Sequence, residues 1–426
     1  MSDVISDPVR QPQVRGAERY RAIRSFTRAL AAPLSAEDCA IQSMTEASPT
    51  KWHLAHTTWF FETFILARHD PQRTAFDPAF RVLFNSYYNA VGDRHPRPQR
   101  GLLSRPSLDE VLAYRDGVDD EMSKLLERDA LAPDLVPLVE LGLNHEQQHQ
   151  ELILTDLKHM LSCNPTRPAY RKNRPLTPIH AARRRWLPVE GGLREIGHAG
   201  HGFAFDNERP RHKVWIEPFE IASLPVTNGE LIDFIDDGGY RRPELWLSLG
   251  WDTVIARGWT VPQYWERRGS RWHHFTLHGM APVEPNAPAC HLSFFEADAF
   301  ARWCGARLPT EAEWESVAAK LPIHGNFVES GVYQPLALRE PPHENVPLQM
   351  YGDVWEWTRS DYAPYPRFRP AEGAVGEYNG KFMCNQYVLR GGSCATSSSH
   401  IRASYRNFFP PEARWQFSGL RLARDV

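Results

Sequence analysis

The chain has 426 residues, which is too many for one hydrophobic core, so two or three domains are expected. Hydrophobic residues make up 42% and charged residues 24% of the chain, as is usual for a globular protein, which argues against an intrinsically disordered chain. A formal net charge of -3 and a pI of about 6.7 give no electrostatic reason to expect nucleic acid or an anionic membrane as a partner.

The N-terminal stretch lacks the apolar core of a signal peptide, and no segment approaches the roughly 18 apolar residues of a membrane-spanning helix. The six cysteines have no C-x-x-C spacing, which indicates reduced thiols. We therefore expect a cytoplasmic protein without a membrane partner. Its oligomeric state stays unknown.

Helical periodicity dominates the first part of the chain. The second predicted helix begins with Ser48 as its N-cap and Pro49 at its first helical position. The third opens with Ser107 and Glu110 in capping-box spacing, and the fourth has Pro137 near its start. The four predicted helices cover residues 16–34, 48–69, 107–128 and 131–161.

A long crossover, residues 70–106, joins the second and third helices. The pattern predicts no regular structure in it, and a connection of that length is usually functional. Four helices with one long crossover are typical of a four-helix bundle.

The character of the sequence changes after this bundle. We assign residues 1–162 to a helical domain, 163–185 to a Pro- and Arg-rich linker, and 186–426 to a loop-rich α+β domain. Short strands are predicted at 212–222 and 387–393, and short helices at 293–306 and 309–320.

The fourth helix carries the sequence "HEQQH". On a helix, His145 and His149 lie about 40° apart and one turn from each other, so they can share one metal ion. Gln148 lies about 60° to the side of His145 and borders the same site. Glu151 lies about 240° round and points away, and Glu146 is expected to face solvent without a catalytic role.

Two ligands do not complete a metal site. The second helix supplies His53 and His56, and only one of them needs to face the bundle interior, where facing helices can jointly hold a metal. Zinc and non-haem iron both accept imidazole nitrogens. Spacing alone leaves open both a metal site and a set of buried core histidines.

"HEQQH" also matches the zinc-protease signature H-E-x-x-H. A metzincin would need Gly and His where this chain has Leu152 and Thr155, and the next glutamate after the helix is Glu190. A zinc-dependent hydrolase is therefore kept only as a remote alternative.

Four ordered motifs in the second half carry a family resemblance: "GARLPTEAEWESVA", "GDVWEWT", "VLRGGSC" and "FSGLRLAR". Together they resemble the formylglycine-generating-enzyme-like (sulfatase-modifying-factor) fold, an α+β domain related to C-type lectins. The first half resembles DinB-type bundles. With "SPTKWHLAHTTWFFETF", "NSYYNAVG", "RGLLSRP", "HEQQHQE" and "YRNFFPPEARWQFSGLRLA", the chain resembles the ergothioneine-biosynthesis sulfoxide synthases, the EgtB-like family.

This resemblance implies a metal and a reaction. It implies non-haem Fe(II) held by His56, His145 and His149, with His53 outside the pattern. The implied reaction uses O2 to join the sulfur of cysteine or γ-glutamylcysteine to C2 of the imidazole of hercynine, giving a sulfoxide. Gln148 and Asn407 are the implied hercynine contacts, so parts of the site would come from both halves of the chain.

The chain departs from the actinobacterial branch of that family, which has Trp-Asp after this asparagine. Phe408 and Phe409 stand there instead, and the lost carboxylate makes free cysteine the preferred thiol. The resemblance implies that Tyr87 and Tyr88 act in proton delivery or radical control, without telling which of them does so.

The expected substrates also suit the residue types. A trimethylammonium group is recognised by aromatic faces, which Phe408, Phe409 and Trp415 can supply, although Trp415 suits packing equally well. A donor carboxylate calls for arginine. We favour Arg97 or Arg100 for it, and a solvated surface position would suit each equally. The candidate arginines of the stretch "DRHPRPQRGLLSR" are Arg94, Arg97, Arg100 and Arg105.

Competing functions remain at this point. Formylglycine generation needs a cysteine directly ahead of Arg402, where this chain has His400 and Ile401, and Cys394 stands where that family has Trp. A selenoneine synthase would join hercynine to a selenosugar. The 5-histidylcysteine sulfoxide synthases usually carry a further methyltransferase domain, which we do not expect here. A binding protein that only stores the metal is the alternative from another class.

Overall fold

The computed structural model describes residues 10–128, 131–172, 183–338 and 346–426, with side chains from residue 16 onward. The chain divides into two compact units, Met1–Met160 with Gly373–Val375, and Leu161–Glu372 with Gly376–Val426. Of the predicted linker, residues 173–182 lie outside the described part.

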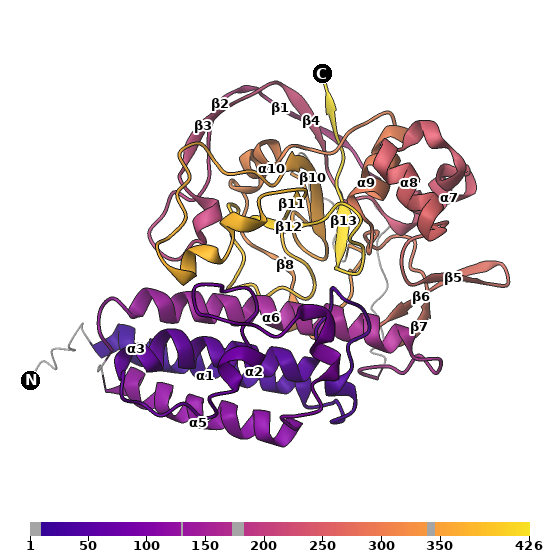
Figure 1. The fold of residues 1–426 in the computed structure, drawn as a ribbon. Coiled ribbons are helices and arrows are strands. Elements are labelled where there is room, and N and C mark those ends of the chain that lie inside the picture. The colour runs from indigo at the N-terminus through magenta and orange to yellow at the C-terminus, as the bar shows by residue number, and fades with distance from the viewer. Residues whose placement is uncertain (1–9, 129–130, 173–182, 339–345) are drawn as a thin grey trace, which may run out of the picture. The chain divides into compact units, whose positions relative to one another are not determined.

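The first unit is a bundle of long helices that lie side by side (Figure 1). The predicted helix at 48–69 is continuous, but its middle turn is a π-helix rather than an α-helix. The four-helix bundle is confirmed. Its helical segments are α1 Arg10–Ala31, α2 Thr50–Phe61, the π-helix Glu62–Leu66, α3 Ala67–His69, α5 Leu108–Glu127 and α6 Val136–Cys163.

Helix α2 is the centre of this bundle, because every one of its residues is buried. A fully buried apolar side chain such as Phe60 contributes about 1.5–3 kcal/mol. Gly142 lets α6 approach α2 closely, since a Cβ there would lie 2.8 Å from a ring carbon of Phe61 and 2.9 Å from one of Phe60. The two helices that carry the candidate histidines are therefore in tight contact.

The predicted start of α2 was wrong by one residue. Pro49 is the N-cap and the helix begins at Thr50. Ser48 is used in tertiary contacts instead: its backbone N–H donates to Asp156 (2.8 Å), and its hydroxyl accepts from Arg100 (2.8 Å).

The predicted cap of α5 is confirmed. The Ser107 hydroxyl accepts from the Glu110 backbone N–H (3.2 Å), and the Glu110 carboxylate accepts from the Ser107 backbone N–H (2.6 Å). This reciprocal capping box fixes where the long crossover ends and α5 begins.

The prediction that the crossover has no regular structure is wrong. It contains the short helix α4 Phe80–Leu83 and a 3-10 helix at Arg97–Leu102. Between them, the Asn85 amide nitrogen donates to the carbonyl groups of Tyr88 (3.0 Å) and Gly92 (3.1 Å), and its oxygen accepts from the Tyr88 N–H (3.1 Å). One buried amide thus holds the loop that carries the two tyrosines.

The second unit is built on a four-stranded sheet with strand order β12-β11-β10-β13 and a three-stranded sheet with order β1-β4-β14. Strands β10 and β13 pair in parallel, and the other pairs of these two sheets are antiparallel. Their bounds are β1 Trp186–Val189, β4 Phe219–Ala222, β10 Trp355–Asp361, β11 Tyr387–Arg390, β12 Asn407–Phe409, β13 Ser418–Leu420 and β14 Ala423–Asp425.

Shorter sheets and helices complete this unit. The predicted short helices are confirmed as α9 and α10, whereas α7 and α8 were not predicted. The remaining elements are β2 Gly192–Ile196, β3 His212–Ile216, β5 Trp265–Arg268, β6 Arg271–Thr276, β7 Gly279–Pro282, β8 Gly325–Asn326, β9 Tyr351–Gly352, α7 Asn228–Asp236, α8 Ser248–Arg257, α9 Phe294–Trp303 and α10 Glu311–Ala318.

Tryptophans and a buried ion pair form the core of the second unit. The indole N–H of Trp314 donates to Glu356 (2.7 Å), and Arg421 bonds the same carboxylate (2.8 Å). Trp357 donates to the Leu292 carbonyl group (2.8 Å). The "GDVWEWT" and "GLRLAR" motifs therefore meet in the core, where their polar atoms are satisfied.

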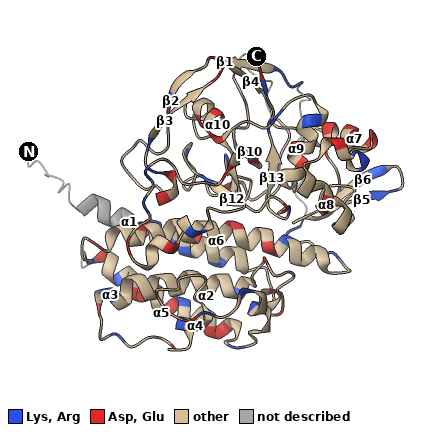
Figure 2. Ribbon diagram, turned by 45° about the horizontal axis from the view of Figure 1, so that its top comes forward, with Lys and Arg blue, Asp and Glu red and all other residues tan. Residues whose placement is uncertain are grey.

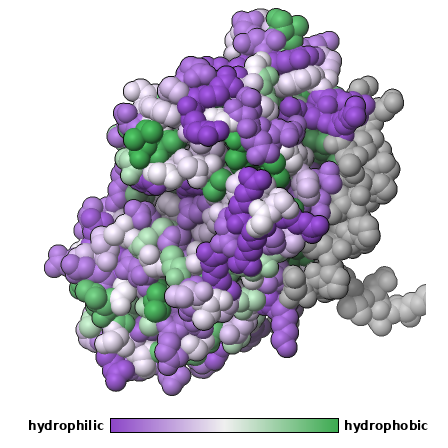
Figure 3. Space-filling view, turned by 90° about the vertical axis from the view of Figure 1, so that its right-hand side faces the viewer, coloured by the Kyte–Doolittle hydropathy of each residue, from purple (hydrophilic) through white to green (hydrophobic). Residues whose placement is uncertain are grey.

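The surface is mixed in character. In the second unit, arginines gather at the β5–β6 turn and acidic residues on α7 (Figure 2). On the face of Figure 3, hydrophobic side chains are scattered among hydrophilic ones. Within the described residues, no helix combines the length and the hydropathy that crossing a bilayer requires. Of the six cysteines, Cys39, Cys290 and Cys394 are buried.

Candidate metal centre

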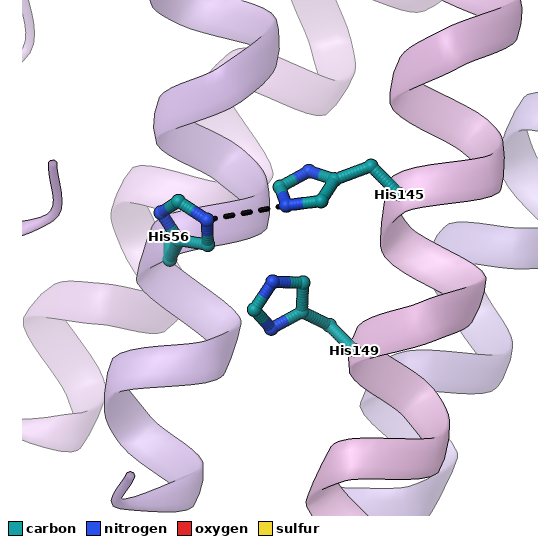
Figure 4. Close-up of side chains that lie close together, drawn as sticks. All are labelled: His56, His145 and His149. Atoms are coloured by element: carbon teal, nitrogen blue, oxygen red, sulfur yellow. Dashed lines mark hydrogen bonds between the residues drawn. The ribbon is translucent and has the colours of Figure 1, made fainter. Parts of the chain in front are cut away.

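Three buried histidines from two helices converge in the first unit. His56 comes from α2, and His145 and His149 come from consecutive turns of α6 (Figure 4). One nitrogen of each lies within 4.8 Å of those of the other two, and the Nε2 atoms of His56 and His145 are 3.2 Å apart. The spacing-based prediction that His145 and His149 face the same point agrees with this geometry.

The orientation of His56 is fixed by the crossover. Its Nδ1 lies 2.6 Å from the Phe84 carbonyl oxygen. A carbonyl oxygen only accepts hydrogen bonds, so Nδ1 carries the proton and donates, and Nε2 keeps its lone pair. That lone pair is directed into the histidine cluster, as a metal ligand requires.

The histidines are neutral at ordinary pH. Burial lowers the pKa of His145 to about 3, and it holds those of His56 and His149 well below their usual range. Neutral imidazole is the form that binds metal ions. Three converging neutral nitrogens fit a divalent transition metal, and they fit iron and zinc alike.

The prediction that Glu146 faces solvent is wrong, because its side chain is fully buried. Its carboxylate pairs with Arg115 and with Arg24 (2.9 Å), and accepts from Thr27 (2.6 Å). Helix geometry explains this, because the residue next to a ligand lies about 100° round the helix. In this bundle that side faces α1 and α5.

These ion pairs decide against protease chemistry. Burial alone would raise the pKa of Glu146, but Arg115 and Arg24 hold it at about 2. A zinc protease needs this glutamate as a general base beside the metal. Glu146 instead joins helices as a permanently charged partner of two arginines.

Aromatic rings surround His56. Its imidazole stacks on Trp52, with centroids 4.6 Å apart and planes 13° apart, and on Trp59 at 5.6 Å and 18°. Tyr88 is fully buried and contacts Trp59 at 5.7 Å, whereas Tyr87 is half-buried with its ring 4.7 Å from that of Tyr88. Tyr88 therefore packs against the aromatic layer that covers His56.

The four candidate arginines, Arg94, Arg97, Arg100 and Arg105, differ in how far they are buried. Arg94, Arg97 and Arg105 are exposed, and Arg97 donates to the Glu46 carbonyl group. Arg100 is buried, its guanidinium carbon lies 3.4 Å from the ring centroid of Trp52, and it donates to Ser48 (2.8 Å).

Arg100 forms no ion pair with a carboxylate of the described residues. Burial, with Arg97 nearby, lowers its pKa from the usual range. A buried cation of this kind is costly without a compensating charge, so a bound anion would stabilise it.

The remaining predicted residues belong to two different units of the chain. Gln148 is half-buried on α6. Asn407, Phe408 and Phe409 form β12 in the second unit, where Asn407 accepts from the Phe408 N–H (2.9 Å). The Phe408 ring stacks on Tyr362, with centroids 4.0 Å apart.

Trp415 is part of the same aromatic packing. Its ring meets Phe409 edge to face, with centroids 6.1 Å apart. This contact agrees with the packing role that the sequence left open for Trp415.

The centre contains two further residues: His53, which the sequence analysis placed outside the ligand pattern, and Asp156, which it did not name. His53 is buried with its Nδ1 2.8 Å from Nδ1 of His149, and its Nε2 lies 3.1 Å from the carboxylate of Asp156. A signal existed for Asp156, because it follows His149 by seven residues and so lies within about 20° of it on the helix.

Comparison with known proteins covers both units. Residues 19–153 match the DinB superfamily, and residues 179–334 and 333–426 match the family described as Sulfatase-modifying factor enzyme 1-like domain. Hercynine oxygenase of Mycolicibacterium thermoresistibile is 35% identical over 416 residues, covering 89% of this chain and 88% of that protein. Hercynine oxygenase of Mycobacterium tuberculosis is 35% identical over 402 residues, covering 89% and 91%.

The likeness to formylglycine-generating enzymes is narrower. That of Streptomyces coelicolor is 27% identical over 280 residues, which cover 56% of this chain and 88% of that enzyme. The likeness to the hercynine oxygenases extends over nearly the whole chain, and both expected family types, DinB and sulfatase-modifying factor, are present in the expected order. The chain therefore belongs to the hercynine oxygenase family, the EgtB-like family that its motifs predict.

Proposed function

We propose that the protein is a metal-dependent oxygenase that uses Fe(II) and O2 to join a thiol sulfur to C2 of the imidazole of hercynine, giving a sulfoxide. The observation that carries this proposal is the convergence of three buried, neutral histidines in a chain of the hercynine oxygenase family. His56, His145 and His149 would hold the metal.

Iron is proposed rather than zinc because the reaction is an oxidation. Zinc has no redox chemistry of its own, whereas bound Fe(II) supplies the activation of O2. The chain supplies the rest: ligand orientation through the Phe84 carbonyl group, and exclusion of water by the rings of Trp52 and Trp59.

Arg100 is the proposed site for the carboxylate of the thiol donor. It is a buried guanidinium without a carboxylate partner among the described residues, and it stacks on the same tryptophan as the ligand His56. A donor carboxylate would compensate its charge with bidentate hydrogen bonds. Cysteine is the preferred donor and γ-glutamylcysteine the second, because Phe408 and Phe409 replace the acidic pattern of the branch that uses the dipeptide.

Tyr88 is the proposed proton donor. Its buried ring contacts Trp59, which in turn stacks on His56, so its phenol belongs to the layer beside the metal ligands. A positioned phenol suits general acid catalysis. Tyr87, half-buried beside it, is proposed to support its orientation.

Gln148 and Asn407 are the proposed contacts to hercynine. Gln148 stands one residue before His149 on α6, and Asn407 stands on β12 with Phe408 and Phe409. The trimethylammonium group would meet aromatic faces. Phe408 already stacks on Tyr362, so Phe409 is the stronger candidate of the two.

The alternatives are less well supported. A selenosugar has no carboxylate for Arg100, and the related proteins are named for hercynine oxygenation, so the selenoneine reaction is not favoured. Zinc hydrolysis would need Glu146 as a base, which its two arginine partners prevent.

The test is reconstitution with Fe(II) under anaerobic conditions, followed by O2 uptake and mass spectrometry. Hercynine is offered with cysteine, γ-glutamylcysteine or a selenosugar in parallel. A hercynyl-cysteine sulfoxide, formed fastest with cysteine, is the expected product.

Two variants make the result specific to the histidines. His145→Ala should abolish O2 uptake, whereas His159→Ala, on the same helix but bonded to Ser43, should retain it. Absence of O2 uptake with every donor, or equal uptake by wild type and His145→Ala, would overturn the proposal.

A further inference from the structure

A chain of three polar side chains runs from Asp156 through His53 to His149. The His53 Nε2 lies 3.1 Å from an Asp156 carboxylate oxygen, and the His53 Nδ1 lies 2.8 Å from the His149 Nδ1. His53 and Asp156 are 2% and 6% exposed, so solvent does not interrupt the chain.

Only one proton arrangement satisfies this chain with neutral imidazoles. A carboxylate accepts, so His53 donates to Asp156 from Nε2. The neutral His53 ring then has a lone pair on Nδ1, and it accepts the N–H of His149 Nδ1. His149 is left with its lone pair on Nε2.

The two ligand histidines are thus held in different ways. His56 donates its Nδ1 proton to the Phe84 carbonyl oxygen, a neutral acceptor on the crossover. His149 donates to an imidazole that is itself polarised by a carboxylate. Negative charge behind the donor increases the basicity of the ring nitrogen that faces the metal.

We propose that His53 and Asp156 are positioning residues of the metal centre: they fix the tautomer and the ring orientation of His149 and strengthen its Nε2 as a ligand. The inference rests on the proposed function only in requiring a metal at the three histidines. It deepens that function by giving a role to a histidine that lies outside the family's ligand pattern.

A packing role alone does not explain the pair. A buried carboxylate is costly unless hydrogen bonds compensate it. Asp156 accepts from His53 and from the Ser48 backbone N–H (2.8 Å), so it ties the start of α2 to α6 on the same side as His149. An apolar pair of similar size would join these helices without that cost.

The test measures metal binding without turnover. Metal-stripped wild type, His53→Asn, His53→Leu and Asp156→Asn are titrated with Co²⁺ against a competing chelator, and the Co²⁺ absorption bands are recorded. His53→Leu removes the acceptor for His149, whereas the oxygen of His53→Asn stands near the lost Nδ1 and can still accept. Asp156→Asn removes the charge and keeps the shape.

We expect His53→Leu to raise the Co²⁺ dissociation constant by about 10- to 100-fold and to shift the absorption bands. Asp156→Asn should also weaken binding, and His53→Asn should recover part of the affinity lost in His53→Leu. The matched control is His159→Asn, another imidazole of α6, whose Nδ1 bonds Ser43 at 2.7 Å; it should bind Co²⁺ as wild type does.

The outcomes separate this inference from the proposed function. If His56→Ala loses Co²⁺ while His53→Leu and Asp156→Asn bind it as tightly as wild type with unchanged bands, the positioning role is wrong and the metal site stands. If His56→Ala also binds as wild type, the metal site itself is wrong. Should His53→Leu fail to fold by circular dichroism, His53→Asn and Asp156→Asn decide the question by the same criteria.

Discussion

Arg100 differs from the other arginines of the crossover by a single property, burial without a carboxylate partner among the described residues. Sequence could not reveal this, because the burial comes from stacking on Trp52 and from the bond to Ser48, both of which depend on the folded bundle. Arg97, three residues earlier, shares the local sequence and remains exposed.

Replacing Arg100 by glutamine should raise the KM for cysteine by about 10- to 100-fold, because a charge-assisted hydrogen bond contributes about 1.5–3 kcal/mol. The kcat should change less, since the carboxylate is bound equally in the ground and transition states. Steady-state O2 uptake at varied cysteine concentration measures both. Arg97→Gln is the control, and equal effects of the two variants would contradict the assignment.

The hydroxyl group of Tyr88 can be tested separately from its aromatic ring. Tyr88→Phe keeps the ring that packs on Trp59 and Phe64 and removes only the hydroxyl group. We expect sulfoxide formation to slow by about 100-fold or more, the usual contribution of a general acid, while the melting temperature stays close to wild type. Tyr87→Phe should slow it less; the reverse order in product analysis would assign the role to Tyr87.

At the scale of elements, α6 shows how one helix serves two purposes. One side carries the candidate ligands His145 and His149, and the side about 100° away carries Glu146. Glu146 lies between Arg24 of α1 and Arg115 of α5, so it joins three helices at the height of the metal centre.

Glu146→Gln should therefore destabilise the metal-free protein by about 3–5 kcal/mol, because it leaves the buried Arg115 without its carboxylate partner and Arg24 with Asp119 alone. Urea-induced unfolding in the presence of a chelator measures this. Asp119→Asn removes the other partner of Arg24, a carboxylate that is 28% exposed. That control should cost less than Glu146→Gln, because solvent reaches Asp119 and Arg24 keeps Glu146 as a partner, and equal losses would refute the buried network.

Glu311, the first residue of α10, should make the stability of the folded protein depend on pH. Glu311 is bonded by Arg390 (2.9 Å) and Arg406 (2.9 Å), the residue before Asn407. Burial alone would raise the pKa of Glu311, but Arg406 and Arg390 hold it below the usual range. A lowered folded-state pKa stabilises the protein above the unfolded-state value of about 4.3, and this contribution is lost as the pH falls further.

Wild type should thus be more stable than Glu311→Gln at neutral pH, and the difference should shrink as the pH falls below about 4.3. Urea midpoints across a pH series measure it. A difference that stays constant down to low pH would mean that the charge of Glu311 does not contribute.

Sequence predicted those elements whose signals are local. The four bundle helices and the α5 capping box follow from periodicity and cap residues, and the i, i+4 histidines follow from helix geometry. α7 is short and was not predicted, although Thr227 and Glu230 form a capping box that marks its start. The π-helical turn, the α4 helix and the inward side of His53 depend on tertiary packing, which no local pattern reports.

At the scale of the whole molecule, the two units should respond differently to metal. The candidate ligands all belong to the first unit. A ligand that binds only the folded state stabilises it by about 2.7 kcal/mol at 100 times its dissociation constant. Hydrogen exchange with and without Fe(II) under anaerobic conditions should therefore show slower exchange in α2 and α6, and unchanged exchange in β10 and β11. Equal slowing in both units would contradict a metal site confined to the bundle.

His56 and His145 are 89 residues apart in the chain, and the segment between them contains the whole crossover and α5. An ion bound by both acts as a reversible cross-link that closes this loop. The loss of chain entropy on closing a loop grows only with the logarithm of the loop length. Packing of the helices already brings the two histidines together, so metal binding then adds little to this loss. We therefore expect the metal to be acquired after the helices have packed, and its release to remove a cross-link that spans 89 residues of the chain. We expect the lifetime of the folded protein, as well as its activity, to depend on metal supply.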